Sequence, residues 1–486
     1  MNRLQSHASK LAGAALAAAL AACSTFGPNY QVPAQAVVRR PAAAAPFASA
    51  SAPAFQSAPL PDQWWHLYQD RTLDALVAKA FAANADLRVA AANLARSRAV
   101  LSEVEEKKRP EVEMNAAPGY GRIAGASLAL PETLPNMGLY SAEVKVGYQV
   151  DLFGKLKRAI EGAEADTEAA QAAADLAHVI VAADTTRAYA DACSAGNEIK
   201  VAQHLVEVQG RFAELTARRV KLGRGTALDN SRAQSQLELL RAALPPLQAR
   251  RRTALYRLAV LTGEVPGNFP AEVARCETPP RVAAAIPVGD GAALLRRRPD
   301  IRQAERLLAG ATARIGVATA ELYPSIQLGV SAGSIGMIPG IGESNTFHFG
   351  LGPLISWNLP ATSAARVHIA QAEAGTAAAL ARFDATVLNA LRETESALTV
   401  YARELDRNAA LTAALRQSTL AASQSATLLR LGRGDSFSAL DAQRTLVQAQ
   451  TALAASETAL AADQATLFLA LGGGWENGAA EGARAR

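Results

Sequence analysis

The chain has 486 residues; half are apolar but only 5% are aromatic, and the formal net charge is +5. Alanine supplies much of the apolar share, which disfavours a compact globule with large core side chains and favours long helices that pack closely. The basic residues are spread out, with no basic stripe or aromatic platform, so the composition argues against a nucleic-acid partner.

Residues 1–22 have the layout of a secretory signal peptide, with Arg3 and Lys10 ahead of a short apolar run. They end in Leu20-Ala21-Ala22-Cys23, which resembles a bacterial lipoprotein box, where the cysteine becomes the lipidated first residue. An ordinary signal peptide with an incidental cysteine is the alternative. Ser24 suits sorting to the outer membrane in the lipoprotein pattern. A lipid on Cys23 would add membrane affinity without spanning anything.

Residues 23–62 form a proline-rich N-terminal segment, expected to be an extended strap over the surface and not a helix. Helical spacing then begins at Leu73 and continues to about Lys108, and Pro110 ends it.

Four stretches alternate between apolar and polar residues, as strands with one apolar face do. The clearest covers residues 142–152, and a weaker partner covers about 111–121. A third covers 325–331 and a fourth 347–352. Four strands cannot close a membrane barrel alone, because open sheet edges are not tolerated in lipid. Several chains must therefore share one barrel, and the alternation alone does not count them.

Two proline-free stretches predict long helices, 155–222 and 361–431. The first would reach roughly 100 Å at the helical rise per residue. A returning helix follows each of them. The first return runs to Leu261 and should kink or split at Pro245-Pro246, whereas the second covers 436–471.

The turn Leu222-Gly223-Arg224-Gly225 recurs as Leu431-Gly432-Arg433-Gly434, an offset of 209 residues. A second offset, of 214 residues, relates Asp86-Leu87-Arg88 to Asp300-Ile301-Arg302. The chain is therefore an internal duplication. We expect a first repeat at 63–262 (helix, strand, strand, long helix, tip, helix), a connector at 263–290, a second repeat at 291–471 and a flexible tail at 472–486.

Several blocks resemble the TolC-like outer-membrane efflux family, in its lipoprotein branch that serves resistance–nodulation–division pumps. The resemblance covers nearly the whole mature chain. The blocks are Trp64-Trp65, Asn84-Ala85-Asp86-Leu87-Arg88, Tyr148 to Lys155, Arg298-Pro299-Asp300-Ile301-Arg302-Gln303-Ala304-Glu305, Ala313 to Ala318, Tyr323-Pro324-Ser325-Ile326, and Leu440-Asp441-Ala442-Gln443-Arg444. The arginine-proline-aspartate block and the aspartate-leucine-phenylalanine-glycine-lysine block together are fairly specific.

The resemblance implies a mainly helical α+β fold in a homotrimer. Each chain would give four strands to a shared outer-membrane β-barrel, continued by a long periplasmic α-helical barrel. The partners implied are a periplasmic adaptor, an inner-membrane proton-driven pump and outer-membrane lipid. One departure is Trp357-Asn358-Leu359-Pro360, where relatives often carry a proline-leucine-phenylalanine run with glycine. It leaves the register of the fourth strand open.

The two tips are the main candidate sites. The resemblance places Gly223, Arg224, Gly225, Gly432, Arg433 and Gly434 where the adaptor would contact the channel, and the alternative is a plain turn between helices. It also places acidic residues near Asp441 at a closed periplasmic gate, where three carboxylates would raise the local cation density. Asp229 is the weaker gate candidate. For both, the alternative is a solvated residue at a helix start.

The strands also carry aromatic residues that could form an interfacial girdle, with ordinary strand packing as the alternative; they are Tyr120, Tyr140, Tyr148, Phe347, Phe349 and Trp357. Asp151 and Gly154 are expected to form a strand-to-helix corner, with Asp151 capping the helix. Cys193 and Cys276 are interpreted as structural, and whether they pair is left open.

No catalytic, phosphate-binding or metal-binding pattern occurs, so we expect no cofactor, no metal and no enzyme activity. The function predicted is passive conduction of drugs or other small molecules in a tripartite efflux system. Two alternatives remain at this stage: the outer-membrane duct of a type I protein secretion system, and a periplasmic coiled-coil adaptor without a pore.

Overall fold

A computed structural model describes residues 25–122, 124, 126, 129, 131–357 and 362–474. The expected signal peptide, Cys23, residues 358–361 and residues 475–486 of the tail lie outside these ranges. The chain falls into two compact units. The sheet unit is Met1–Pro33, Leu94–Ala170 and Ala304–Phe383; the helical unit is Ala34–Asn93, Gln171–Gln303 and Asp384–Arg486.

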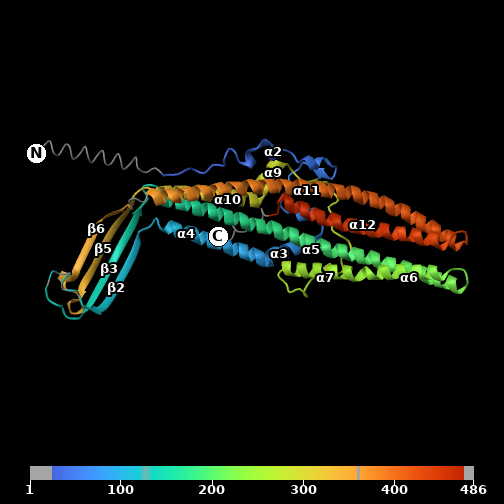
Figure 1. Ribbon diagram of the computed structural model, residues 1–486, viewed down its shortest axis with the longest axis horizontal. Helices are drawn as coiled ribbons and strands as arrows, with labels where there is room; N and C mark the ends of the chain where they lie inside the picture. The colour runs from blue at the N-terminus through green and yellow to red at the C-terminus, as the bar shows by residue number, and fades with distance from the viewer. Residues whose placement is uncertain are drawn as a thin grey trace. The chain divides into compact units, whose positions relative to one another are not determined.

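The main elements appear in Figure 1 in the order that the duplication predicts. They are α3 (Arg71–Ala83), α4 (Ala85–Glu106), β2 (Glu111–Gly121), β3 (Met137–Val150), α5 (Lys155–Lys221), α6 (Ala227–Ala242), α7 (Leu244–Leu261), α9 (Gly291–Arg297), α10 (Pro299–Ala320), β5 (Ser325–Met337), β6 (Phe347–Ser356), α11 (Thr362–Arg430) and α12 (Ser436–Leu471). Shorter elements are η1 (Val37–Arg39), α2 (Pro41–Ala44), η2 (Ala48–Ser51), β1 (Phe55–Gln56), η3 (Trp64–Tyr68), α8 (Ala271–Ala274), β4 (Ile286–Pro287), η5 (Ile338–Gly340) and η6 (Ser344–Thr346). None of the helices in these ranges is long and apolar enough to cross a membrane.

The sheet unit contains an antiparallel sheet in the order β2-β3-β5-β6. All four strands predicted from alternation are present. Strand β3 begins earlier and ends two residues earlier than predicted, and β5 continues to Met337, because small residues there pair without an alternation signal. The register of β6, open at the sequence level, sets Phe349 opposite Ala332 and Ile355 opposite Ile326.

Both long helices are confirmed. Helix α5 runs unbroken through Gly196 and Gly210, although glycine is unfavourable in a helix interior. Packing explains Gly196, since a Cβ there would lie 2.1 Å from the Cys276 carbonyl oxygen. The first return splits at Ala243 into α6 and α7, next to Pro245-Pro246 as predicted.

The single helix expected between Leu73 and Lys108 is wrong, because it breaks at Asn84. The Asn84 Oδ1 accepts from the amides of Asp86 (2.8 Å) and Leu87 (3.3 Å), which caps α4. The side-chain amide nitrogen of Asn84 donates to the Leu261 carbonyl at 3.0 Å. A long-range contact thus supplies the reason for the break.

The core of the helical unit is built around Trp64, whose ring stacks on Phe468 at 4.5 Å. The Trp64 indole donates to the Gly473 carbonyl at 3.2 Å. Residues 472–474 are buried, so the expectation of a flexible tail is wrong for them. The proline-rich strap does contain short helical turns, contrary to expectation, and it buries Phe47 and Phe55 in this core.

The arginine-proline-aspartate block joins two helix ends to the middle of a third helix. The partly buried Arg298 guanidinium donates to the Ala470 carbonyl at the end of α12 (2.9 Å), to Asp300 at the start of α10 (2.7 Å) and to Glu393 in the middle of α11 (3.0 Å). A guanidinium has enough donors for all three, which a lysine would not arrange in one plane.

Candidate functional site: the hairpin tips and the sheet faces

The two tips have the same backbone geometry. Gly223 and Gly432 are left-handed, with φ of 70° and 72°. Arg224 donates its amide to the Arg219 carbonyl at 2.8 Å, and Arg433 donates to the Leu428 carbonyl at 2.9 Å. Gly223 and Gly432 each donate to the carbonyl three residues back. These paired bonds make a Schellman motif, which a helix uses to end on a glycine.

The second glycine of each tip has a different reason to be there. A Cβ at Gly434 would lie 3.1 Å from Leu428 Cβ, and a Cβ at Gly225 would lie 3.3 Å from Val220 Cγ2. Both positions are therefore close approaches of the returning chain to the outgoing helix. Arg224 and Arg433 are exposed, and within the described ranges no hydrogen bond or ion pair joins their side chains to another group.

The two aspartates predicted for the gate have different surroundings. Asp229 forms a capping box with Thr226: its carboxylate accepts from the Thr226 amide (3.0 Å) and hydroxyl (2.8 Å). These bonds hold the pKa of Asp229 below its usual value. This geometry matches the alternative to the gate role, in which Asp229 is a residue at a helix start.

Asp441 is exposed on α12 and lines a groove between α6 and α12. The groove encloses about 510 Å³ and is lined by Ser231, Arg232, Ser235, Gln236, Phe437, Leu440, Asp441 and Arg444. The Arg232 guanidinium lies over the Phe437 ring, 5.7 Å from its centroid. The structure thus brings Asp441, Arg232 and Arg444 into one groove and leaves Asp229 outside it.

The sheet has one apolar and one polar face. Opposed residues in the register share a face, so the apolar face carries Val112, Met114, Val144, Val146, Tyr148, Ile326, Leu328, Val330, Phe347, Phe349, Leu351 and Ile355. Many of these side chains are exposed in one chain, including Phe349 at 78% and Leu351 at 80%. A continuous exposed apolar face of this kind is typical of lipid contact.

The polar face differs between its two halves. Strands β2 and β3 place Glu111, Glu113, Glu143 and Lys145 there, with Lys145 Nζ 3.0 Å from Glu143. Strands β5 and β6 place no Asp, Glu, Lys or Arg on the same face. Gly329, Gly333, Gly350 and Gly352 alternate there with larger uncharged residues, including Gln327, Ser331, His348 and Leu354. A groove of about 520 Å³ follows this boundary. Charge is therefore confined to the strands of the first repeat.

The aromatic candidates lie at three levels along the strands. Tyr120 and Tyr140 lie near the end of the sheet where β3 begins, since Tyr120 pairs with Gly138. Phe347 and Phe349 lie level with Ala142 and Val144, near the middle of β3. Tyr148 and Trp357 lie toward the other end. The interfacial girdle therefore stays a prediction.

The strand-to-helix corner forms as predicted. The Asp151 carboxylate accepts from the amides of Leu156 (3.1 Å) and Lys157 (2.8 Å), and Gly154 has a φ of 75°. The prediction missed the N-terminal segment at this corner. Arg158, which is buried, donates to the carbonyls of Phe26 and Gly27, each at 3.0 Å.

The Phe26 ring stacks on Tyr323 at 4.3 Å, and Tyr323 stacks on Phe153 at 4.8 Å. A Cβ at Gly316 would lie 2.9 Å from the Phe26 carbonyl oxygen, so glycine is required there too. These contacts form a binding site for Phe26 and Gly27, which follow Cys23 closely in the sequence. The only sequence signal for it was the glycine in an otherwise helical stretch.

The model of the family described as "Outer membrane efflux protein" matches the chain over residues 76–264 and again over 292–473. The chain belongs to the outer membrane efflux protein family. The double match also agrees with the duplication found in the sequence.

Similar proteins include Nodulation protein T of Rhizobium leguminosarum bv. trifolii, 28% identical over 85% of this chain and 88% of that protein. The toluene efflux pump outer membrane protein TtgC of Pseudomonas putida is 29% identical over 94% of this chain and 93% of its own length. Among solved structures, the outer-membrane channel OprN is 33% identical, with a TM-score of 0.86 over 93% of this chain and 100% of OprN.

Membership settles the architecture that the resemblance implied. The protein is an outer-membrane channel of a tripartite efflux system, and its four strands are one chain's share of a barrel formed by a homotrimer. Its helices form the periplasmic part, where an adaptor and an inner-membrane pump are its partners. The family consists of channel proteins. The alternative of a periplasmic coiled-coil adaptor without a pore is therefore excluded.

Proposed function

We propose that the protein conducts small solutes passively from its pump to the exterior, with the adaptor held at the two tips and a gate that depends on Asp441. The observation that carries the proposal is the sheet, apolar on one face and charged or glycine-rich on the other, within a chain that has two matching helical tips. The protein itself performs no chemical step. Energy comes from the partner pump.

The tips suit docking because they combine close backbone approach with a free cation. Gly225 and Gly434 let each returning chain lie against its helix, and Arg224 and Arg433 extend from an otherwise identical turn. A turn needs only the glycines, so the repeated arginine supports a contact with an acidic or hydrogen-bond-accepting surface on the adaptor.

The gate proposal favours Asp441 over Asp229. Asp229 is occupied by its capping box, whereas no ion pair to the Asp441 carboxylate occurs within the described ranges. In a trimer three such carboxylates would attract cations and repel one another. Arg232 and Arg444 in the same groove are the groups whose distance from Asp441 would tune that repulsion.

Anchoring completes the proposal. The site that holds Phe26 and Gly27 begins three residues after Cys23, so an acyl chain on Cys23 would start within about 11 Å of Phe26. The proposed lipid therefore enters the membrane near the strand-to-helix corner.

The decisive experiment is single-channel conductance of the purified trimer in planar bilayers, for the native protein, Asp441→Ala and the comparison variant Asp229→Ala. Cation-preferring openings that last longer in Asp441→Ala alone would support the duct and the gate. Equal behaviour of all three would keep the duct and remove Asp441 from the gate. A folded trimer that stays closed even when both tips carry Gly→Val changes would reject conduction.

The tips need a separate test, since conductance does not involve the adaptor. Arg224→Glu with Arg433→Glu should abolish site-specific crosslinking between the channel and its adaptor while single-channel conductance stays unchanged. Arg241→Glu, on the exposed side of α6, is the matched charge reversal away from the tips. Equal loss in both proteins would reject a specific role for the tip arginines.

A further inference from the structure

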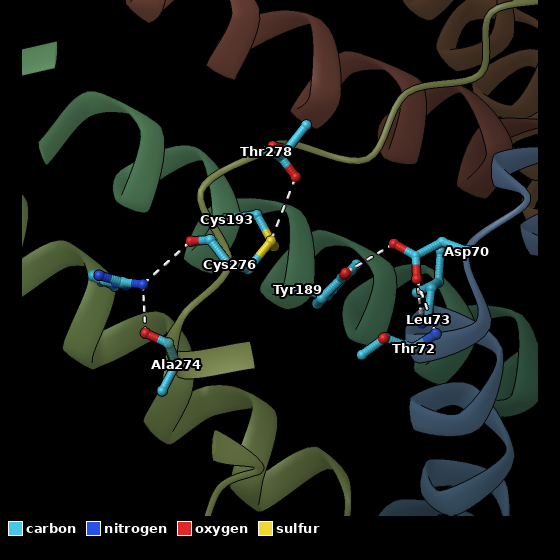
Figure 2. The surroundings of a disulfide bond; sticks show 9 residues. Asp70, Thr72, Leu73, Tyr189, Cys193, Ala274, Cys276 and Thr278 are labelled. Carbon is cyan, nitrogen blue, oxygen red and sulfur yellow. Dashed lines mark hydrogen bonds between the residues drawn. A yellow bond between two sulfur atoms is a disulfide. The ribbon is translucent and has the colours of Figure 1, made fainter. Parts of the chain in front are cut away.

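The connector between the two repeats is fixed to α5 by a disulfide. Cys193 of α5 and Cys276, just after α8, are bonded (Figure 2). Their Cα atoms are 4.7 Å apart, and the two cysteines are 83 positions apart in sequence. The loop so closed contains the tip half of α5, the first tip, α6 and α7. The first hairpin is thus covalently closed at its base.

Non-covalent contacts hold the same stretch of connector against the helices. The Arg251 side chain of α7 donates to the carbonyls of Ala274 and Cys276. Gln464 of α12, which is buried, bonds both the amide (3.2 Å) and the carbonyl (3.1 Å) of Val282. The disulfide is therefore one of several attachments along the connector and the only covalent one within the described ranges.

The neighbouring turn of α5 has a second attachment. Tyr189, one helical turn before Cys193, donates its hydroxyl to Asp70 at 2.8 Å (Figure 2). Asp70 in turn caps α3 through the amides of Thr72 and Leu73. One stretch of α5 thus holds both the connector and the start of the first repeat.

Cys193 is wholly buried in the core of the helical unit, and the connector covers it. A thiol at this depth is out of reach of any protein oxidant once the connector is in place. The bond must therefore form while the chain is still folding. Disulfides form and persist in the bacterial periplasm, where the signal peptide would deliver the chain.

No third thiol competes for the pairing of Cys193 with Cys276 once Cys23 is lipidated. The chain has three cysteines, and Cys23 is the proposed lipidation site, which would leave Cys193 and Cys276 as the only thiols. The absence of a competing thiol rests on the proposed lipidation, whereas the bond itself does not. At the position that the duplication relates to Cys193, the second repeat has Ala402.

We propose that this channel is a substrate of a periplasmic thiol oxidase, and that oxidation of Cys193 and Cys276 is a required step before the connector packs and the trimer assembles. A thiolate of one cysteine attacks the disulfide of the oxidase and forms a mixed disulfide. The second cysteine then displaces the oxidase. The channel loses two protons and two electrons, and the oxidase disulfide becomes a dithiol.

Closing a loop of this length restricts the unfolded chain and so favours the packed connector. Without the bond, the hairpin and the connector must find α5 by diffusion, and unassembled chains are exposed to periplasmic proteases for longer. Efflux capacity would then depend on the oxidising state of the periplasm.

The test follows thiols in the full-length protein in cells with and without the oxidase, using a maleimide polymer that shifts each free thiol on a gel. In oxidising cells the native chain should show no adduct, and two adducts only after reduction in denaturant. In oxidase-deficient cells two adducts should persist and the yield of heat-resistant trimer should fall about ten-fold. Cys193→Ser with Cys276→Ser should lower the yield equally in both strains, and Ser194→Ala, a buried neighbour without a hydrogen-bond partner, should not.

Two outcomes would overturn the proposal. One is a native trimer purified from oxidising cells that shows two adducts in denaturant without reduction. The other is a double-serine variant with the native trimer yield and native resistance to proteolysis in residues 263–290. If the double variant fails to fold at all, oxidase-deficient cells with the native chain still decide the question. A third adduct would instead mean that Cys23 is not acylated, which counts against the proposed lipidation alone.

Discussion

The two helical hairpins have the same tip geometry, but different contacts hold them away from the tip. Their turns have the same pair of backbone bonds around Gly223 and Gly432. Yet the first return is split into α6 and α7 and its base is closed by a disulfide, whereas the second return, α12, is one helix of 36 residues. The duplication therefore preserved the tip, which we propose contacts the adaptor, while the supporting structure diverged.

Valine at either tip glycine should have the largest effect and should be equal at both tips. A β-branched residue in the left-handed region costs about 1–2 kcal/mol, so we expect tip amides to exchange about ten-fold faster in Gly223→Val and in Gly432→Val. Hydrogen exchange resolved by peptide checks this. Gly375→Ala is the control, because space is open around that glycine in α11 and alanine favours the helix. A clear effect at one tip only would show that the turns are not energetically equivalent.

Thr226→Ala should separate the two hairpins. It removes the cap that accepts from the Asp229 amide at 3.2 Å, so the start of α6 should lose about 1 kcal/mol while the start of α12 keeps its Asp435 cap. Faster exchange confined to the first turn of α6 is the expected result. Thr226→Ser keeps the hydroxyl and should stay close to native; similar losses in Ala and Ser variants would contradict the cap.

Acidification should loosen both helix starts through different carboxylates. Hydrogen bonds from Thr226 lower the pKa of Asp229, and bonds from Ser438 lower the pKa of Asp435. A lowered folded pKa gives stability that is present above the unfolded value, near 4, and is lost as the pH falls through the folded pKa. Exchange at both starts should therefore quicken as the pH falls below about 4. Asp229→Asn should abolish this dependence in α6 alone, and its survival there would assign it to another group.

Arg232→Ala should have the smallest effect, and it tests what joins the hairpins at the tips. The guanidinium over Phe437 is exposed, and such a pair contributes about 0.5–1 kcal/mol. We expect slightly faster exchange on both α6 and α12, and a partial return in Arg232→Lys. A change restricted to α6 would mean that the ring contact does not couple the two helices.

Local pattern predicted the regular elements well, and long-range contacts account for what it missed. Alternation located β3, but β5 continues through Gly333, Ser334 and Gly336, whose small side chains carry no face preference. Helical spacing across Asn84 looked continuous, because the cap that breaks it also depends on Leu261, far along the chain.

The candidate sites show the same limit. The tips could be located from the repeat alone, and the sequence already ranks Asp441 above Asp229 as a gate candidate. Only the structure gives a physical reason for that order, because Asp229 bonds to Thr226 while Asp441 faces the groove beside Arg232. The pairing of Cys193 with Cys276 likewise needed coordinates, since two cysteines 83 residues apart have no spacing signal.

The divided polar face of the sheet has a consequence for the whole trimer. Each chain brings charge on β2 and β3, whereas the same face of β5 and β6 carries uncharged residues, several of them glycine. Threefold repetition then gives the inner wall three charged strips that alternate with three uncharged, glycine-rich strips. A solute with a cationic end and an apolar end would meet a charged strip beside an uncharged one. It could move along the boundary between the two strips while staying in contact with both.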